Sequence, residues 1–224
     1  MIDQIRERAE EMTARLRSAA ERAGRDPDGF RIVAVTKGFG TDVARAALGA
    51  GLTRLGENRV QEALPKVAAL PDAEWHLIGR LQRNKARKAV AAFAVIHSVD
   101  SIELLRRVDD DATGAGLAPR LLLEVNVSGE PTKAGFAVER LDEVVPALSQ
   151  RVVGLMTMAR HDADEAEQRR TFAALRMLRD RLQESGGIGL PELSMGMSRD
   201  AEAAVAEGAT LVRIGTALFG PRPR

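Results

Sequence analysis

Two residue types that carry much protein chemistry are missing from this sequence. The 224-residue chain has no cysteine and no tyrosine, and aromatic residues make up only 3% of it. The absence of cysteine excludes disulfides, thiolate metal ligands and thiol nucleophiles. The absence of tyrosine excludes any reaction in which a phenol of this chain acts as an acid or a base.

An excess of charge of either sign is also missing. Lys and Arg number 33 against 32 for Asp and Glu, so the formal net charge is +1. A balanced chain gives no general electrostatic reason to bind nucleic acid or a membrane, and we expect neither as a partner. The charged N-terminal stretch MIDQIRERAEEMTARLRSAAERAG has no apolar run long enough for a signal peptide or a membrane span. We therefore expect a cytoplasmic protein.

The chain does have a regular alternation of short apolar segments and helical patterns. Apolar residues at helical spacing between Ile2 and Leu16 predict an N-terminal amphipathic helix that ends near Gly24. Eight short apolar segments follow, and we interpret them as strands. They are RIVAVT from Arg31, TRLGEN from Thr53, WHLIG from Trp75, AVIHSVD from Ala94, RLLLEVNVS from Arg120, RVVGLMTM from Arg151, ELSMGM from Glu192 and TLVRIG from Thr210.

Helical patterns separate these strands, and the alternation predicts the fold. The patterns cover 42–50, 60–70, 84–92, 101–110, 138–148, 162–182 and 199–207. Asp162 followed by Glu165 has capping-box spacing, which predicts where one helix begins. Strands that are apolar on both faces are typical of parallel sheets. We expect an α/β protein with one domain over residues 1–224, a (β/α)8 TIM barrel preceded by an extra helix, with an open doubly wound sheet as the alternative.

The chemistry of such a barrel lies at the C-terminal ends of its strands, and a lysine follows the first of them. Lys37, partly shielded from water at this rim, would have a lowered pKa, so its neutral amine could attack a carbonyl and form a Schiff base. The alternative is that its ammonium reaches solvent or pairs with a rim carboxylate such as Glu57. The lysine alone does not decide between the two.

The last two strands add a candidate anion site at the same rim. Ser198 lies where a helix is expected to begin, and Gly215 and Thr216 open the final short helix, so hydroxyls and backbone N–H groups can converge on a phosphate. Each residue alone is also consistent with an ordinary helix cap or turn. A Schiff-base lysine beside a phosphate site indicates pyridoxal 5'-phosphate (PLP) or a phosphorylated aldehyde or ketone.

Seven motifs show a resemblance to a known family. Along nearly the whole chain they read VAVTK at Val33, GENRVQE at Gly56, WHLIGRLQRNK at Trp75, SVDS at Ser98, EVNVSGEPTKAGF at Glu124, GLMTM at Gly154 and LSMGMSRDAEAAVAEGATLVRIGTALFG at Leu193. In these motifs the chain resembles the pyridoxal-phosphate homeostasis protein family. Its members are single-domain, fold-type III PLP-binding barrels similar to the N-terminal domain of alanine racemase.

The resemblance implies a role for each matching residue. Lys37 would hold PLP as an internal aldimine, and Asn58 would lie beside the ring. Arg213 would face the pyridine nitrogen; because arginine keeps its proton, that nitrogen would stay unprotonated and the ring would be a weaker electron sink. The phosphate would be bound by Ser198, Gly215 and Thr216. Three methionines, for which core packing is the preferred interpretation, would line the pocket: Met156, Met195 and Met197.

The sequence departs from the family pattern in two places. Arg59 stands where many relatives have a tyrosine, which puts a ring-stacking role at that position in doubt. A basic cluster follows, for which we prefer a solvated helix face to a phosphate or nucleic-acid site. It consists of Arg80, Arg83, Lys85, Arg87 and Lys88.

The missing tyrosine also bears on catalysis. Racemisation on PLP needs an acid–base group on each face of the substrate Cα, and in alanine racemase the second group is a tyrosine that comes with a C-terminal domain absent here. A histidine could replace it. We interpret His161 as a loop residue, and His76 and His97 as strand histidines with satisfied hydrogen bonds.

Three functions therefore stay open, and the resemblance favours the first. That one is a non-catalytic PLP carrier that buffers the cofactor and delivers it to PLP-dependent apoenzymes. The alternatives are a PLP-dependent amino-acid racemase and a Schiff-base aldolase that acts on a sugar phosphate. A self-contained barrel needs no partner to complete its site, so we expect a monomer, with a dimer as the alternative.

Overall fold

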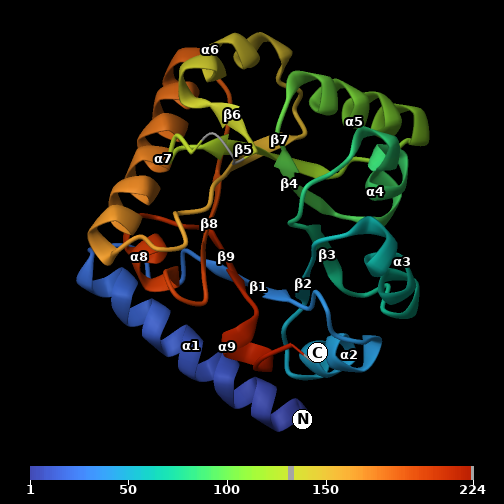
Figure 1. The fold of residues 1–224 in the computed structure, drawn as a ribbon, viewed down its shortest axis with the longest axis vertical. Coiled ribbons are helices and arrows are strands. Elements are labelled where there is room, and N and C mark those ends of the chain that lie inside the picture. Colours follow the sequence, from blue (N-terminus) through green and yellow to red (C-terminus); the bar gives the residue numbers. More distant parts are fainter. Residues whose placement is uncertain (131–133, 223–224) are drawn as a thin grey trace.

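The computed structural model describes residues 1–130 and 134–222, and it contains the expected closed barrel. Eight parallel strands pair in the order β4-β3-β2-β1-β9-β8-β7-β5, and pairing of β4 with β5 closes the ring (Figure 1). Because the ring of strands is closed, the alternative prediction of an open doubly wound sheet is excluded. The barrel strands are β1 (Arg31–Val35), β2 (Arg54–Glu57), β3 (Glu74–Leu77), β4 (Val95–Val99), β5 (Arg120–Asn126), β7 (Val152–Met156), β8 (Glu192–Met197) and β9 (Leu211–Ile214). A two-residue strand, β6 (Phe136–Ala137), pairs with the end of β5 and was not predicted.

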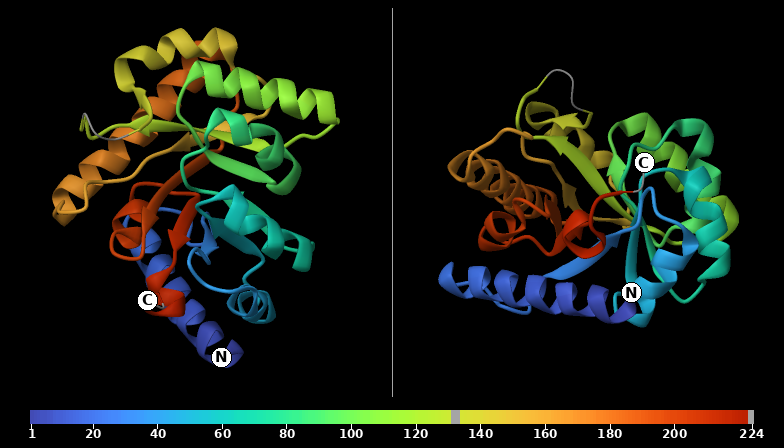
Figure 2. Two further views of the ribbon diagram at one scale, coloured as in Figure 1. Left: turned by 45° about the vertical axis from the view of Figure 1, so that its right-hand side comes forward. Right: turned by 60° about the horizontal axis from the view of Figure 1, so that its bottom comes forward.

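Helices cover the outside of the barrel, as Figure 2 shows from two further directions. They are α1 (Ile2–Arg22), α2 (Thr41–Gly49), α3 (Val60–Ala69), α4 (Ala86–Ala92), α5 (Ile102–Ala115), α6 (Leu141–Val144), α7 (Glu165–Gly186), α8 (Ala201–Ala206) and α9 (Thr216–Phe219). The extra helix α1 buries an apolar stripe against α8, α9 and α2. Within the described ranges, no helix is both long and apolar enough to cross a membrane.

Two helix predictions need correction. The expected helix over 138–148 is broken into 3-10 turns at Val138–Arg140 and Val145–Ala147, with only α6 between them. Pro146 lacks the N–H that a longer helix would need. The helix expected from Asp162 begins later, because Asp164 is its N-cap and accepts a hydrogen bond from the N–H of Glu167 at 2.7 Å. Asp162 instead pairs with Arg160.

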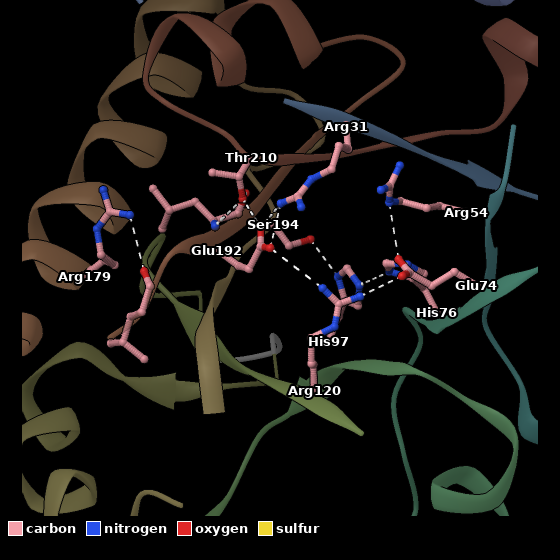
Figure 3. A network of polar contacts seen from close by, with 12 residues as sticks. Arg31, Arg54, Glu74, His76, His97, Arg120, Arg179, Glu192, Ser194 and Thr210 are labelled. Atoms are coloured by element: carbon pink, nitrogen blue, oxygen red, sulfur yellow. Dashed lines mark hydrogen bonds and ion pairs between the residues drawn. The ribbon is translucent and has the colours of Figure 1, made fainter. Parts of the chain in front are cut away.

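The middle of the barrel interior contains both apolar and buried polar side chains, and the base is charged. Five of the barrel strands begin with a charged residue, and their side chains form the basal charge cluster: Arg31, Arg54, Glu74, Arg120 and Glu192. Signs alternate around it, because Glu192 pairs with Arg31 and Arg120, while Glu74 pairs with Arg120 and Arg54 (Figure 3). The cluster closes the end of the barrel opposite the candidate site. The sequence analysis did not predict the basal charge cluster, because a charged residue at the start of an apolar segment only indicates where a strand begins and not which other charges it meets.

Candidate functional site

Lys37 lies in the turn that follows β1, at the rim where the sequence predicts it. Its neighbour Gly38 has a φ of +78°, a conformation that glycine adopts freely and that turns the chain at the rim. The Lys37 side chain is half-buried. Burial lowers the pKa of its ammonium, and the positive charges of Arg222 and Arg213 lower it further, while Glu57 opposes them. A larger share of Lys37 is therefore the neutral amine that attacks carbonyls.

Glu57 is held by a different lysine, so the alternative in which it pairs with Lys37 is wrong. Its Oε1 accepts hydrogen bonds from Lys66 Nζ at 2.6 Å and from the Thr36 hydroxyl at 2.7 Å. Lys66, on α3, also donates to the carbonyl oxygen of Thr36 at 2.9 Å. The Glu57–Lys66 pair is buried between β2 and α3. It fixes the backbone of Thr36, directly before Lys37.

Arg213 projects from β9 into the barrel and is almost fully buried. Its NH1 group donates to Ser194 O at 2.8 Å and to Ser194 Oγ at 2.6 Å, and NH2 donates to Thr157 O at 2.9 Å. A guanidinium has five N–H donors, so these three bonds leave two, one on NH2 and one on Nε. Burial lowers the pKa of Arg213 to about 10, against the opposing effect of Asp200 and Glu124. It remains a cation at neutral pH, with two donors for a ligand.

The residues predicted to bind phosphate come together from two loops. Ser198, after β8, accepts hydrogen bonds at its Oγ from the N–H groups of Gly215 and Ala217, each at 3.4 Å. Thr216 lies between those two residues and is exposed. Ser198 is not the helix cap that the sequence suggests, because α8 begins at Ala201 with Asp200 as its N-cap. The hydroxyl and the N–H groups are therefore gathered at one point of the rim.

Asn58 follows β2 and is half-buried beside the basic cluster. The backbone at Asn58 approaches Gly79 so closely that a Cβ on Gly79 would lie 2.8 Å from Asn58 Cα. Asn58 lines a cavity of about 240 Å³ together with Arg59, Arg80 and others. In the basic cluster only Lys85 is half-buried, and its other four members are exposed. This confirms a largely solvated face.

Several side chains have the structural roles that the sequence predicts. Met156 packs inside the barrel and Met195 packs between the barrel and its helices, which confirms core packing for these two. For Met197 the core interpretation is wrong, because its side chain is exposed. Arg59 pairs with Glu62 at 3.0 Å on the surface, and His161 is an exposed loop residue.

Glu124 is a rim residue that the sequence analysis missed, although its position at the end of β5 could have found it. Pairing around the closed barrel places β5 opposite β1, so Glu124 and Lys37 come from opposite walls. The Glu124 side chain is buried and forms no hydrogen bond or ion pair within the described part of the chain. Burial raises the pKa of its carboxyl, and the negative charge of Asp100 adds to this, while Arg213 opposes both.

We expect Glu124→Gln to stabilise the protein at neutral pH. The unfolded chain ionises Glu124 at a lower pH than the folded chain does, so the free energy of unfolding falls as pH rises from the unfolded pKa to the raised folded pKa. The glutamine removes that loss, for a gain of about 1 kcal/mol near pH 7 and none below about pH 4. Urea unfolding against pH measures it, with the exposed Glu184→Gln as control. A gain that is equal at both pH values would contradict this explanation.

The geometry at the rim fits a phosphorylated aldehyde with a basic ring nitrogen. Lys37 offers an amine whose pKa burial lowers, and Arg213 offers two N–H donors from a buried cation. Ser198 accepts long hydrogen bonds from the N–H groups of Gly215 and Ala217 and keeps its own hydroxyl proton to donate to an anion; an anion that displaces the hydroxyl oxygen would also gain the two N–H donors. An amine, an anion site and a cationic donor on neighbouring strands β1, β9 and β8 can hold such a molecule at three points.

Comparison with known proteins defines the class. The family model described as the alanine racemase N-terminal domain matches residues 8–223. The structure of PipY from Synechococcus elongatus with PLP bound is 42% identical, with a TM-score of 0.86, and the match covers 96% of this chain and 100% of that one. An alanine racemase from Clostridium difficile shares the fold at 14% identity and a TM-score of 0.74, over 99% of this chain and 58% of that one. The protein is thus a barrel of the alanine racemase N-terminal domain family.

Curated relatives narrow this class further. The pyridoxal phosphate homeostasis protein of Pseudomonas aeruginosa is 45% identical over 225 residues, which cover 97% of this chain and 96% of the relative. The protein of the same name from Aquifex aeolicus is 42% identical over 222 residues, which cover 96% of this chain and 97% of the relative. The chain belongs to the pyridoxal phosphate homeostasis protein family.

Proposed function

We propose that this protein binds PLP, with its aldehyde held covalently by Lys37, and serves as a carrier that buffers the cofactor. The observation that carries the proposal is the placement of Lys37, half-buried and with a lowered pKa, at the same rim as the two free donors of Arg213. The PLP-bound structure of PipY supports it, as do the relatives named pyridoxal phosphate homeostasis protein.

Each residue of the site has a distinct part in this proposal. Lys37 supplies the neutral amine, and Asn58 lies beside the ring. Arg213 donates to the ring nitrogen and stays charged, which keeps a proton off that nitrogen. Ser198, Gly215 and Thr216 receive the phosphate. When bound, PLP supplies an aldehyde that reacts with amines and a ring that accepts electrons.

A carrier suits these residues better than a racemase does. Arg213 weakens the ring as an electron sink, and the chain has no tyrosine to act on the second face of a substrate. Glu124, a buried rim carboxyl on the wall opposite Lys37, is a candidate to take that place. A racemisation assay on the wild type and Glu124→Gln distinguishes the two functions. Activity that the substitution abolishes would identify an enzyme.

We also propose where the protein acts, what it does with the cofactor and in which oligomeric state. The protein acts in the cytoplasm, it delivers PLP to apoenzymes, and it does so as a single-domain monomer. The chemistry of Lys37 supports delivery, because a lysine with a lowered pKa readily exchanges its carbonyl partner with other amines. Incubation of the loaded protein with a PLP-dependent apoenzyme, followed by an assay of that enzyme, tests delivery directly.

We expect Lys37→Ala to abolish covalent retention of PLP. Borohydride reduction of the wild type should fix a pyridoxyl-phosphate group on the peptide that contains Lys37, and the variant should carry none and lose the visible absorption. Lys85→Ala is the matched control, since Lys85 is also a half-buried lysine near the rim. Peptide mass analysis and the visible spectrum are the measurements.

The same experiment separates the proposal from an aldolase. A protein that stays colourless with added PLP, and is reduced on Lys37 only in the presence of a sugar phosphate, would overturn the carrier in favour of an aldolase. Labelling that survives Lys37→Ala would place the cofactor on another lysine.

A further inference from the structure

A continuous chain of hydrogen bonds runs through the barrel interior from Arg213 to the basal charge cluster. Arg213 NH1 lies 2.6 Å from Ser194 Oγ, which lies 2.8 Å from His97 Nδ1. His97 Nε2 lies 2.8 Å from His76 Nδ1, and His76 Nε2 lies 2.8 Å from Glu74 Oε1. Figure 3 shows the part from Ser194 to Glu74, which crosses from β8 to β4 and β3. Of these residues, only Arg213 has a role in the proposed binding of PLP.

The carboxylate at one end and the neutral imidazoles fix the direction of every bond in the chain. A guanidinium only donates, so Ser194 Oγ accepts from Arg213, and a hydroxyl could still accept a second hydrogen bond there. The direction is therefore set from the other end: Glu74 accepts from His76 Nε2, and with both imidazoles neutral the proton of Ser194 goes to His97 Nδ1. His97 must then carry its proton on Nε2 and donate to His76 Nδ1, and His76 must carry its proton on Nε2 and donate to Glu74. An ionised carboxylate only accepts, so the chain ends there. These tautomers are assigned from the hydrogen-bond partners.

The surroundings of each group agree with this arrangement. The hydrogen bond from His76 lowers the pKa of Glu74 to about 2, with help from Arg120 and Arg54, so Glu74 is ionised. His76 and His97 have no exposed surface, and burial lowers the pKa of both. The charge of Arg213 lowers the pKa of His97 further. Two neutral imidazoles between a buried cation and a carboxylate give every ring nitrogen of His76 and His97 a hydrogen-bond partner.

We propose that Ser194, His97, His76 and Glu74 are positioning residues, and that their one-way hydrogen-bond chain fixes the guanidinium of Arg213 so that its two free N–H donors face the ligand. Ser194 alone gives Arg213 two of its three acceptors. The orientation of its hydroxyl depends on His97, whose tautomer depends on His76 and Glu74. The chain thus links the basal charge cluster to the ligand end of the barrel.

The proposal explains why a buried arginine has no carboxylate in direct contact. Arg213 forms no ion pair within the described residues, and its three acceptors are uncharged. The carboxylates whose negative charge acts on Arg213 are Asp200 and Glu124, and neither forms a hydrogen bond or ion pair with it among the described residues. An arginine that is not neutralised by a neighbouring carboxylate keeps its full charge for a ligand atom. This inference rests on the proposed role of Arg213 toward PLP, although the series of hydrogen bonds from Arg213 to Glu74 is present whether or not PLP binds there.

The experiment compares Ser194→Ala with Ser98→Ala. Both serines are fully buried, and Ser98 donates to Gly79 O at 2.7 Å and has no side-chain hydrogen bond to Ser194, His97, His76 or Glu74. Nitrogen-15 NMR of histidine-labelled protein without PLP reports the tautomers, and titration with PLP reports affinity. In the wild type at neutral pH we expect His97 and His76 to be neutral with the proton on Nε2. Ser194→Ala should disturb the tautomer of His97 and raise the Kd for PLP about tenfold, while Ser98→Ala changes neither.

The outcomes separate this inference from the proposed function. A proton on Nδ1 of His97, or an imidazolium at neutral pH, would overturn the direction of the chain. Equal PLP affinity in the two variants, each with a folded circular dichroism spectrum, would reduce Ser194 to a packing residue and overturn its positioning role. If the expected tautomers are found and the wild type binds no PLP, the proposed function fails, and with it the role of the chain toward PLP.

Discussion

Replacement of Lys66 by methionine should lower the free energy of unfolding by about 3–5 kcal/mol, the usual loss when one partner of a buried ion pair is removed. Lys66 Nζ lies 2.6 Å from Glu57 Oε1, and the Glu57 side chain is fully buried. Its other oxygen, Oε2, already has no hydrogen-bond partner. Without Lys66, only the Thr36 hydroxyl would solvate a buried carboxylate. Methionine has a similar length and fills the space, so the loss reports charge rather than a cavity.

Two further variants isolate the pair. Lys88→Met, on the exposed face of α4, is the control for a lysine-to-methionine change and should alter stability by no more than about 0.5 kcal/mol. The double variant Lys66→Met/Glu57→Gln should recover most of the loss, because a neutral amide can still accept from Thr36. Urea unfolding followed by Trp75, the only tryptophan, measures all three. A loss in Lys66→Met no larger than that in Lys88→Met would contradict the argument.

The same variant should also weaken PLP binding. Lys66 donates to the carbonyl oxygen of Thr36, directly before Lys37, so its loss frees the backbone that positions the candidate nucleophile. We expect slower capture of PLP by Lys37 under conditions in which the variant is still folded. The effect would show that a residue from the covering helix α3 contributes to the rim site.

The sequence predicted the barrel because its signals are local. Apolar strands, helical spacing and a glycine after Lys37 are each visible within a few residues, and the strand-end rule then places Lys37, Ser198 and Gly215 on one rim. The hydrogen bonds from Gly215 and Ala217 to Ser198 confirm that two of those loops meet. Helix ends were less certain, because Asp162 and Asp164 are both plausible caps and only the contacts choose between them.

The parts that were missed depend on partners far apart in the chain. Arg31 and Glu192 are separated by 161 residues, and nothing local indicates that they meet at the base of the barrel. The same holds for His97, which was interpreted as a strand histidine, and for its partner Ser194, to which the sequence analysis gave no role. From the sequence alone, Lys66 is consistent with a surface lysine of an amphipathic helix. Only the structure shows that it packs over the end of β2 and pairs with Glu57. The 131–133 portion of the EVNVSGEPTKAGF motif lies outside the described residues.

Replacement of Gly154 by alanine should lower the free energy of unfolding by roughly 3 kcal/mol, at the upper end of ordinary overpacking. Gly154, in β7, is paired with Glu192 in β8. A Cβ at this position would lie 2.7 Å from the carbonyl carbon of Glu192 and still closer to its oxygen. The obstacle is backbone, which cannot rotate away as a side chain does, so β7 and β8 would have to separate.

That separation should reach the candidate site. Arg213 is held by the carbonyl oxygens of Thr157, after β7, and Ser194, in β8, so moving the two strands apart changes both contacts. We therefore expect weaker PLP binding together with the loss of stability. Gly114→Ala is the control, because Gly114 lies in α5 and the added Cβ would meet no described atom within 4 Å other than the local backbone of its own helix. This variant should gain up to about 1 kcal/mol. Urea unfolding and PLP titration of both variants measure the changes in stability and in PLP affinity. A Gly154→Ala protein as stable as the wild type would contradict the argument, because β7 and β8 would then accommodate the methyl group.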